Sequence, residues 1–270
     1  MLSVLILTYN EECNVSDCIK SVPWRTDVHV LDSMSTDATT DLALALGAKI
    51  YRKDFVGHAS QRNLGLSLPF ENEWIVMLDS DERMTDELAS EIEKRIAAAG
   101  PQDVMFRVRR KDMFMGRWLR RASGYPTWFP RVFRRGRVRV EREINEIYVA
   151  DGQTIELREH LNHYPFNKGI EWWFERHNAY STKEAALIAS GQNWIPRLSL
   201  DSITDSGRRR ATLKAILYRL PFGPFWAFLY LLIVRRGFVD GYPGFVYACM
   251  RLSYEIMISA KVAYARASRS

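Results

Sequence analysis

The sequence predicts an α/β fold, in which helices cover both faces of a mostly parallel sheet. Within the first 100 residues, continuous apolar runs of strand length alternate with stretches of helical periodicity. Such alternation is typical of a doubly wound sheet, and continuous apolar runs are typical of strands covered on both sides. Carboxylates and hydroxyls follow three of the runs directly, at the strand ends where such sheets bind their ligands.

The apolar pattern and the end signals place each element in order. Strands are predicted at residues 3–8, 27–31, 49–51 and 74–78, with helices after each of them, at about 15–22, 36–46, 57–68 and 85–98. Ser35 or Thr36 is expected to cap the second helix, and Thr85 to cap the fourth. Arginine and apolar residues alternate at 107–109 and 132–140, which predicts half-exposed antiparallel strands.

The composition is that of a folded globular chain. Its 270 residues are 47% apolar and 26% charged, which excludes a disordered, collagen-like or small disulfide-rich protein. This length is typical of one domain, or of one domain with a smaller appendage. The three cysteines form no C-x-x-C pair, and no basic region or cleavage site marks the N-terminus. We therefore expect a reducing compartment and no signal peptide.

The two parts of the chain carry opposite charge. Residues 1–100 contain 9 Lys and Arg against 17 Asp and Glu, whereas residues 101–270 contain 29 against 15. The acidic part could hold a metal or a carboxylate site. The basic part could bind phosphates or an anionic membrane surface.

Asp79 and Asp81 form the sharpest local feature of the acidic part. They lie two residues apart on an extended segment, so both carboxylates can point to one side. Hard oxygen ligands suit Mg²⁺ or Mn²⁺, although the same residues could form an exposed acidic cluster. Asp32 could accept a hydrogen bond from a ribose or a base, or cap its own turn. The sequence has no glycine-rich phosphate loop, so a bound diphosphate would depend on a metal.

Four motifs, in their order along the chain, resemble family 2 glycosyltransferases, which have the GT-A (Rossmann-like) fold. They are Leu5-Ile-Leu-Thr-Tyr-Asn-Glu11, Asp32-Ser-Met-Ser-Thr-Asp37, Gln61-Arg-Asn63 and Met77-Leu-Asp-Ser-Asp-Glu82. Within that family the chain is most similar to the lipopolysaccharide core glucosyltransferase-like branch. The motifs cover residues 1–82, and the resemblance continues more weakly to about residue 185. Met34 departs from the branch, which usually has Gly there.

The resemblance implies an inverting transfer from a nucleotide-diphosphate sugar, with a UDP-sugar as the expected donor. The expected acceptor is a glycan or a lipid-linked molecule of cell-envelope polysaccharide or lipopolysaccharide biosynthesis. Asp79 and Asp81 would hold Mg²⁺ or Mn²⁺ on the diphosphate and so stabilise its developing charge. The residues implied to bind the donor are Thr8, Tyr9, Asn10, Glu11, Asp32, Ser33, Arg62, Asn63, Asp79 and Ser80.

The reaction needs a general base that takes the proton of the acceptor hydroxyl. The resembling branch has a His-Glu pair after a Phe-Pro-Arg-like segment, and here Trp128-Phe-Pro-Arg131 is followed by Asn145-Glu146. Glu146 is therefore the expected base, with Glu143 as its competitor. Arg131 and Trp128 are expected near the acceptor or the diphosphate.

Residues 107–139 contain 12 Arg and Lys and one acidic residue, interleaved with aromatic residues. Such a segment can bind single-stranded nucleic acid, a phosphate-bearing acceptor or anionic lipid. We favour acceptor and membrane contacts and expect no nucleic-acid partner, because a nucleic-acid site leaves the acidic part unexplained. A basic nucleic-acid-binding α/β protein and a non-catalytic membrane-surface carbohydrate-binding module are the competing functions. His163, further along, is interpreted either as a structural histidine or as a residue of the site.

The C-terminal third has the pattern of a segment that lies on a membrane surface. A helix is predicted at 170–190 and an amphipathic helix at 245–265, and between them residues 221–234 carry no charge. This run is too short to cross a hydrocarbon core of about 30 Å, which needs about 20 helical residues. Basic residues flank it, so we expect a peripheral, interfacial segment on the cytoplasmic face of the inner membrane. Packing on the catalytic domain or in a homo-oligomer is the alternative.

These patterns together predict a chain of two parts. Residues 1–190 are expected to form the GT-A domain, with 1–100 as its nucleotide-sugar half and 101–165 as its acceptor half. Residues 191–270 are expected to form a helical, membrane-associating region.

Overall fold

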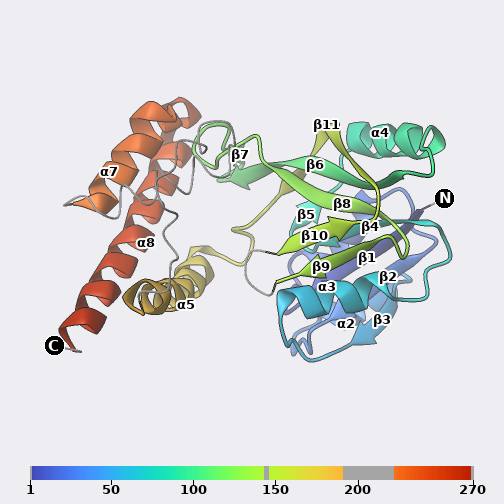
Figure 1. Ribbon diagram of the computed structural model, residues 1–270, viewed down its shortest axis with the longest axis horizontal. Coiled ribbons are helices and arrows are strands. Elements are labelled where there is room, and N and C mark those ends of the chain that lie inside the picture. The colour runs from blue at the N-terminus through green and yellow to red at the C-terminus, as the bar shows by residue number, and fades with distance from the viewer. Residues whose placement is uncertain (1, 143–145, 191–221, 269–270) are drawn as a thin grey trace. The chain divides into compact units, whose positions relative to one another are not determined.

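The computed structural model describes residues 2–142, 146–190 and 222–268, which belong to two compact units. Met1–Met113 and Tyr125–Asn167 form the first unit, and Phe114–Gly124 and Lys168–Ser270 form the second. The observed division therefore differs from the predicted boundary after residue 190. The reason is that the helix that follows Asn167 packs against the C-terminal helix (Figure 1).

The first unit contains a mixed main sheet and a separate two-stranded hairpin. Its strands are β1 (Leu2–Thr8), β2 (Val28–Asp32), β3 (Lys49–Arg52), β4 (Trp74–Asp79), β5 (Glu82–Arg83), β6 (Asp103–Phe114), β8 (Trp128–Arg134), β9 (Val138–Glu141), β10 (Ile147–Ala150) and β11 (Gln153–His163). Its helices are α1 (Val15–Ser21), α2 (Thr39–Ala45), α3 (His58–Leu66) and α4 (Asp86–Ala97).

The strand order of the main sheet is β3-β2-β1-β4-β8-β6-β11-β5 (Figure 1). β3, β2, β1 and β4 are parallel, and β8 is antiparallel to both of its neighbours, β4 and β6. β11 is parallel to β6 and antiparallel to β5, and β9 pairs with β10 in a separate hairpin. The predicted α/β class with a mostly parallel donor half is confirmed.

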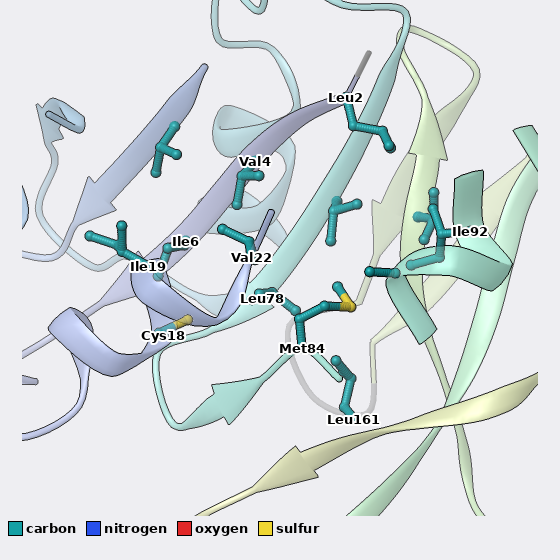
Figure 2. Close-up of a cluster of buried hydrophobic side chains, with 14 of the residues drawn as sticks. Leu2, Val4, Ile6, Cys18, Ile19, Val22, Leu78, Met84, Ile92 and Leu161 are labelled. Carbon is teal, nitrogen blue, oxygen red and sulfur yellow. The ribbon is translucent and has the colours of Figure 1, made fainter. Parts of the chain in front are cut away.

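Apolar layers cover both faces of the sheet, because successive residues of a strand point to opposite sides. Leu2, Val4 and Ile6 of β1 join the core beneath α1 and α4, which Figure 2 shows. Leu5, between them, joins the core on the other face, beneath α3 and the β9–β10 hairpin. Gly65 brings α3 close to that face, since a Cβ there would lie 2.7 Å from the Leu5 side chain.

One of the two predicted helix caps is confirmed. Thr85 caps α4, its Oγ1 accepting the backbone N–H of the third residue after it at 3.2 Å. The predicted cap of α2 by Ser35 or Thr36 is wrong, because that helix begins only at Thr39. The carboxylate of Asp37 accepts the Thr39 N–H, and Ser35 and Thr36 contact the loop after β1 instead.

The second unit is helical. It contains β7 (Arg117–Trp118), α5 (Ile170–Ala189), α7 (Gly223–Leu229), the π-helical turn η2 (Tyr230–Val234), the 3₁₀ turn η3 (Gly237–Asp240) and α8 (Gly241–Ala267). The helices predicted at 170–190 and 245–265 are confirmed as α5 and as part of α8. The ring of His177 on α5 stacks on Trp173 and meets Tyr254 of α8 edge-on, which joins the two helices.

The uncharged run predicted at 221–234 forms α7 and η2 from Gly223 onward. Its first residue, Pro221, and the basic residues that precede it lie outside the described residues. Within the described ranges, none of the helices combines the length and the apolar character that crossing a bilayer requires.

Candidate active site

A buried carboxylate locks together the loops that follow β1 and β2. Asp32 has no exposed surface, and its Oδ1 accepts the hydroxyl groups of Thr8 at 2.8 Å and Ser35 at 2.5 Å. Its Oδ2 accepts the Ser35 N–H at 2.7 Å. Asp32 therefore caps its own turn, which is one of the two roles that the sequence left open. Its contact with a base or ribose stays a prediction.

Polar contacts hold in place most of the other residues of these two loops that were predicted to bind the nucleotide-sugar donor. Asn10 has a left-handed φ of 51°, and its side-chain oxygen accepts the Thr36 N–H at 2.9 Å. Side-chain amides donate to the hydroxyl of Ser33 and to the carboxylate of Glu11, each at 2.9 Å. Tyr9 exposes 57% of its surface. The loops thus present a fixed backbone with an exposed aromatic ring.

A buried arginine organises the acidic turn after β4. The guanidinium of Arg131 donates to both carboxylate oxygens of Glu82, at 2.7 and 2.8 Å, and to Oδ2 of Asp79 at 2.7 Å. Burial opposes ionisation of Asp79, but Arg131, with Arg62 and Arg110, holds the pKa of that carboxyl well below its usual range. Arg131 was predicted to lie near the acceptor or the diphosphate. Its side chain is 4% exposed and fixes the turn, and its proximity to the acceptor or the diphosphate stays a prediction.

Asp81 contacts a histidine rather than an arginine. The Nε2 atom of His163, at the end of β11, lies 3.2 Å from Oδ2 of Asp81. Its Nδ1 atom lies 2.7 Å from Oδ1 of Asp112. Burial disfavours the imidazolium, but Asp81 and Asp112 together outweigh burial and raise the pKa of His163 to about 9. Both ring nitrogens of His163 therefore contact carboxylates, and its role in the site stays a prediction.

Joint binding of a metal by Asp79 and Asp81 stays a prediction, and in this structure the carboxylate of Asp79 pairs with Arg131 and that of Asp81 with His163. Within the described residues, three or more His, Cys, Asp or Glu side chains nowhere gather as a metal site would require. Asp81 and His163 do converge, and a nucleotide-bound ion needs only one or two protein ligands, since phosphates and waters supply the rest. The pair therefore fits Mg²⁺ or Mn²⁺, with Asp112 orienting the imidazole.

Arg62 of α3 links the acidic turn to the predicted base. Its Nη2 lies 3.5 Å from Oδ1 of Asp79, and its Nε lies 3.5 Å from Oε1 of Glu146. Glu146 also lies 3.6 Å from Nδ1 of His58. Burial would lower the pKa of Arg62, but the charge of Asp79 raises it. The structure thus places Arg62 and Glu146 beside the turn after β4, whereas Glu143 lies outside the described residues.

Three further residues that were predicted to bind the donor or the acceptor, Asn63, Ser80 and Trp128, make different contacts. The side-chain amide of Asn63 exchanges two hydrogen bonds of 2.8 Å with the backbone of Val140, which fastens α3 to β9. Ser80 donates to the carbonyl of Leu7 at 3.1 Å. The indole Nε1 of Trp128 is buried and meets no hydrogen-bond partner in the described part of the chain. Asn63 and Ser80 therefore hold the backbone of the site, while Trp128 retains an unused donor.

The sequence analysis did not identify Asp112 and Arg110, which complete the group of charged side chains around the turn after β4. The guanidinium of Arg110 lies 3.3 Å from Asp112 and 3.7 Å from Glu82, and it covers the ring of Phe129 at 4.1 Å. One signal could have found Asp112, because it is the one acidic residue of the basic segment 107–139.

Comparison with known proteins identifies the family. The chain matches Glycosyl transferase family 2 over residues 3–165, from β1 to just beyond β11. It is 31% identical over 251 residues to an uncharacterized glycosyltransferase of Rickettsia bellii, covering 91% of this chain and 80% of that protein. It is 25% identical to the lipopolysaccharide core biosynthesis glycosyltransferase LpsC of Rhizobium meliloti, covering 97% of this chain and 91% of LpsC.

Among solved structures, a weaker likeness is to glucosyl-3-phosphoglycerate synthase from Mycobacterium tuberculosis. That crystal structure is in complex with Mn²⁺, uridine-diphosphate-glucose and phosphoglyceric acid. The likeness covers 41% of this chain and 44% of that one, at 22% identity and a TM-score of 0.36. The family match over most of the first unit, together with the α/β topology, shows that the chain is a GT-A fold protein that belongs to glycosyltransferase family 2.

Proposed function

We propose that this protein is a metal-dependent, inverting glycosyltransferase that moves a sugar from a UDP-sugar to a glycan or lipid-linked acceptor. The observation that carries the proposal is the convergence of Asp81 and His163 at the end of β4. Ligands of doubly wound sheets bind at this edge, where the strands end. Family membership supports sugar transfer, and the geometry supports a metal at this position.

Asp81 and His163 are the residues that would hold the divalent ion, Mg²⁺ or Mn²⁺. Asp112, 2.7 Å from Nδ1 of His163, would keep a proton on that atom, and a bound ion would replace the proton on Nε2. Bound there, the ion would stabilise the negative charge that develops on the departing diphosphate.

Asp79 and the arginines beside it supply fixed charge around the donor. Arg131 binds Oδ2 of Asp79 tightly, while Oδ1 has Arg62 at the longer distance of 3.5 Å. The Asp79 side chain remains 32% exposed. Oδ1 can therefore accept a hydrogen bond from a hydroxyl of the donor, and the positive charge of Arg62 favours a diphosphate nearby.

Glu146 is the proposed general base. It takes the proton of the acceptor hydroxyl while that oxygen bonds to the anomeric carbon, and the electron pair of the broken bond leaves with the diphosphate. Attack from the face opposite the diphosphate inverts the configuration of that carbon. The ion pair with Arg62, at 3.5 Å, holds the carboxylate beside the acidic turn, and the side chain is 25% exposed to an incoming acceptor.

The acceptor class follows from the relatives rather than from the site. The similarity to LpsC extends over almost the full length of both chains, and LpsC is named for lipopolysaccharide core biosynthesis. We therefore propose a sugar of a cell-envelope glycan as the acceptor, either lipopolysaccharide core or a lipid-linked glycan.

A thermal unfolding screen of the full chain tests this proposal. UDP-sugars should raise the melting temperature in the presence of MnCl₂ or MgCl₂ and much less in the presence of EDTA. A ligand at 100 times its Kd adds about 2.7 kcal/mol of stability. Asp81→Asn should abolish the metal-dependent part. Asp151→Asn, at a carboxylate that is 82% exposed on the surface, is the matched control and should leave it unchanged. Equal stabilisation of the Asp81 variant, or stabilisation that ignores metal, would contradict the metal assignment.

A further inference from the structure

Large apolar side chains are exposed around the N-terminal end of α8. Phe238 and Val239 in η3 and Tyr242 in α8 expose 57%, 55% and 68% of their surfaces. Other exposed apolar residues of the neighbouring elements are Phe222, Phe225, Trp226, Ile233, Val234 and Phe245. α7, η2 and η3 all pack against α8, so these side chains belong to one group of packed helices (Figure 1). So many exposed large apolar groups in one region indicate an interaction site.

A basic loop is fastened to the same turn. The carboxylate of Asp240 in η3 accepts the backbone N–H groups of Arg120, Arg121 and Ala122, at 3.1, 2.8 and 2.8 Å. These bonds join segments that lie about 120 residues apart. They use only the backbone of the loop, so the side chains of Arg120 and Arg121 remain exposed. Arg117 of the same loop lies against η3's end, since a Cβ at Gly241 would be 3.7 Å from its guanidinium.

We define the docking surface as residues 117–121 and 233–242. It contains five arginines and a single acidic residue, Asp240. Asp240 caps the loop and offsets one of the five positive charges, so the cations remain in excess. The surface therefore combines exposed aromatic and aliphatic groups with a strong excess of cations.

We propose that the docking surface binds an anionic lipid bilayer. Phe238, Val239 and Tyr242 would enter the interface between headgroups and acyl chains, and the arginines would contact the headgroup phosphates. A second copy of the chain fits this surface poorly. A twofold interface would bring together two surfaces that each carry five arginines and one acidic residue, and their like charges would repel. The proposal does not depend on the transferase activity.

Co-sedimentation of the full chain with vesicles tests the proposal. Vesicles of phosphatidylcholine mixed with phosphatidylglycerol should bind the protein, vesicles of phosphatidylcholine alone should not, and added salt should weaken binding. Arg120→Gln with Arg121→Gln should lower the partition coefficient about 30-fold, since each cation near an anionic surface contributes about 1 kcal/mol. Phe238→Ser with Val239→Ser should lower it at least about tenfold.

Two matched controls keep the result specific. Tyr264→Ser removes an aromatic ring of α8 that is 78% exposed but lies outside the docking surface. Arg139→Gln removes a cation of the first unit that is 67% exposed. Both variants should bind as the unchanged chain does. All substituted side chains are exposed, and circular dichroism verifies that each variant is folded.

Three results would overturn the proposal. The first is equal binding to neutral and anionic vesicles, and the second is unchanged binding of both docking-surface variants. The third is self-association in sedimentation velocity that Phe238→Ser with Val239→Ser removes, in a chain that binds no vesicles. That outcome would assign the surface to contact between copies instead.

Discussion

The Nε2 atom of His163 lies 3.2 Å from Oδ2 of Asp81, although 82 residues separate the two along the chain. The pairing of β11 with β5 produces this contact, because its register sets His163 opposite Glu82, the residue next to Asp81. The candidate metal site therefore depends on an antiparallel pairing of two strands from distant parts of the sequence. Asp112, on β6, completes it from a third strand.

Asp112→Asn should weaken metal-dependent UDP binding by about 10- to 100-fold, because it removes the carboxylate that orients the His163 imidazole. Calorimetric titration of UDP with MnCl₂ present measures the loss. The small affinity that remains in EDTA should change little, since Asp112 acts on the ion through the histidine. Equal loss with and without metal would indicate that the substitution disturbs the fold instead.

Glu146→Gln should leave UDP-sugar binding intact and lower the transfer rate by about 10²- to 10⁴-fold, the usual contribution of a general base. Turnover is followed as UDP release in the presence of acceptor, and binding is followed by calorimetry. Glu141→Gln, at an exposed carboxylate of β9, is the control and should keep full activity. If Glu143→Gln is inactive while the Glu146 variant turns over, the base is Glu143.

Arg131→Ala should destabilise the first unit by about 3–5 kcal/mol, because it leaves the buried carboxylate of Glu82 with only the more distant Arg110, at 3.7 Å, as counter-charge. Denaturant unfolding measures the change. Arg139→Ala, whose partner Glu141 is also exposed, should cost less than about 1 kcal/mol. A combined Arg131→Met and Glu82→Gln variant should recover part of the loss, since it removes both charges. A loss as small as that of the Arg139 variant would refute the buried ion pair.

Met34→Gly should stabilise the chain by about 0.5–1 kcal/mol. Met34 has a φ of 65°, a left-handed conformation that costs a residue with a Cβ about 1–2 kcal/mol. Glycine removes this cost, but part of the gain is lost because glycine gives the unfolded chain more conformational freedom. Met34→Ala keeps the Cβ and should gain nothing. The midpoints of denaturant unfolding distinguish the two. This explains physically why the resembling branch usually has Gly at the position.

The second unit should lose stability as the pH falls from about 6.5 to about 4. Burial lowers the pKa of His177 to about 4, although its hydrogen bond to the Trp173 carbonyl acts in the opposite direction. Between that pKa and the usual value near 6.5, the unfolded chain binds a proton that the folded chain does not, so acid favours unfolding. His177→Phe keeps a ring beside Trp173 and removes the titration. The stability difference between the two proteins should change over this interval and be constant above it. A difference that does not vary with pH would contradict the prediction.

Much of the donor half was predictable because its signals are local. The apolar run before Asp79 predicts β4, and Thr85 predicts the start of α4, since the capping hydroxyl acts within one turn. The start of α2 was wrongly predicted for a physical reason. Ser35 and Thr36 have the right side chains for a cap, but the loop after β1 takes them as hydrogen-bond partners. Tertiary contacts decided between two local possibilities.

The sequence by itself determined the α/β class, the family and the loops that form the candidate site, because period, order and spacing along the chain carry that information. Only the tertiary structure decided which charges meet. It paired the carboxylate of Asp79 with Arg131 and that of Asp81 with His163. The two aspartates are so close in the chain that local sequence cannot tell which partner each one has. It also fastened the arginine loop at 120–121 to the apolar turn at Asp240. Pairings of this kind depend on strand order and register, which long-range packing fixes.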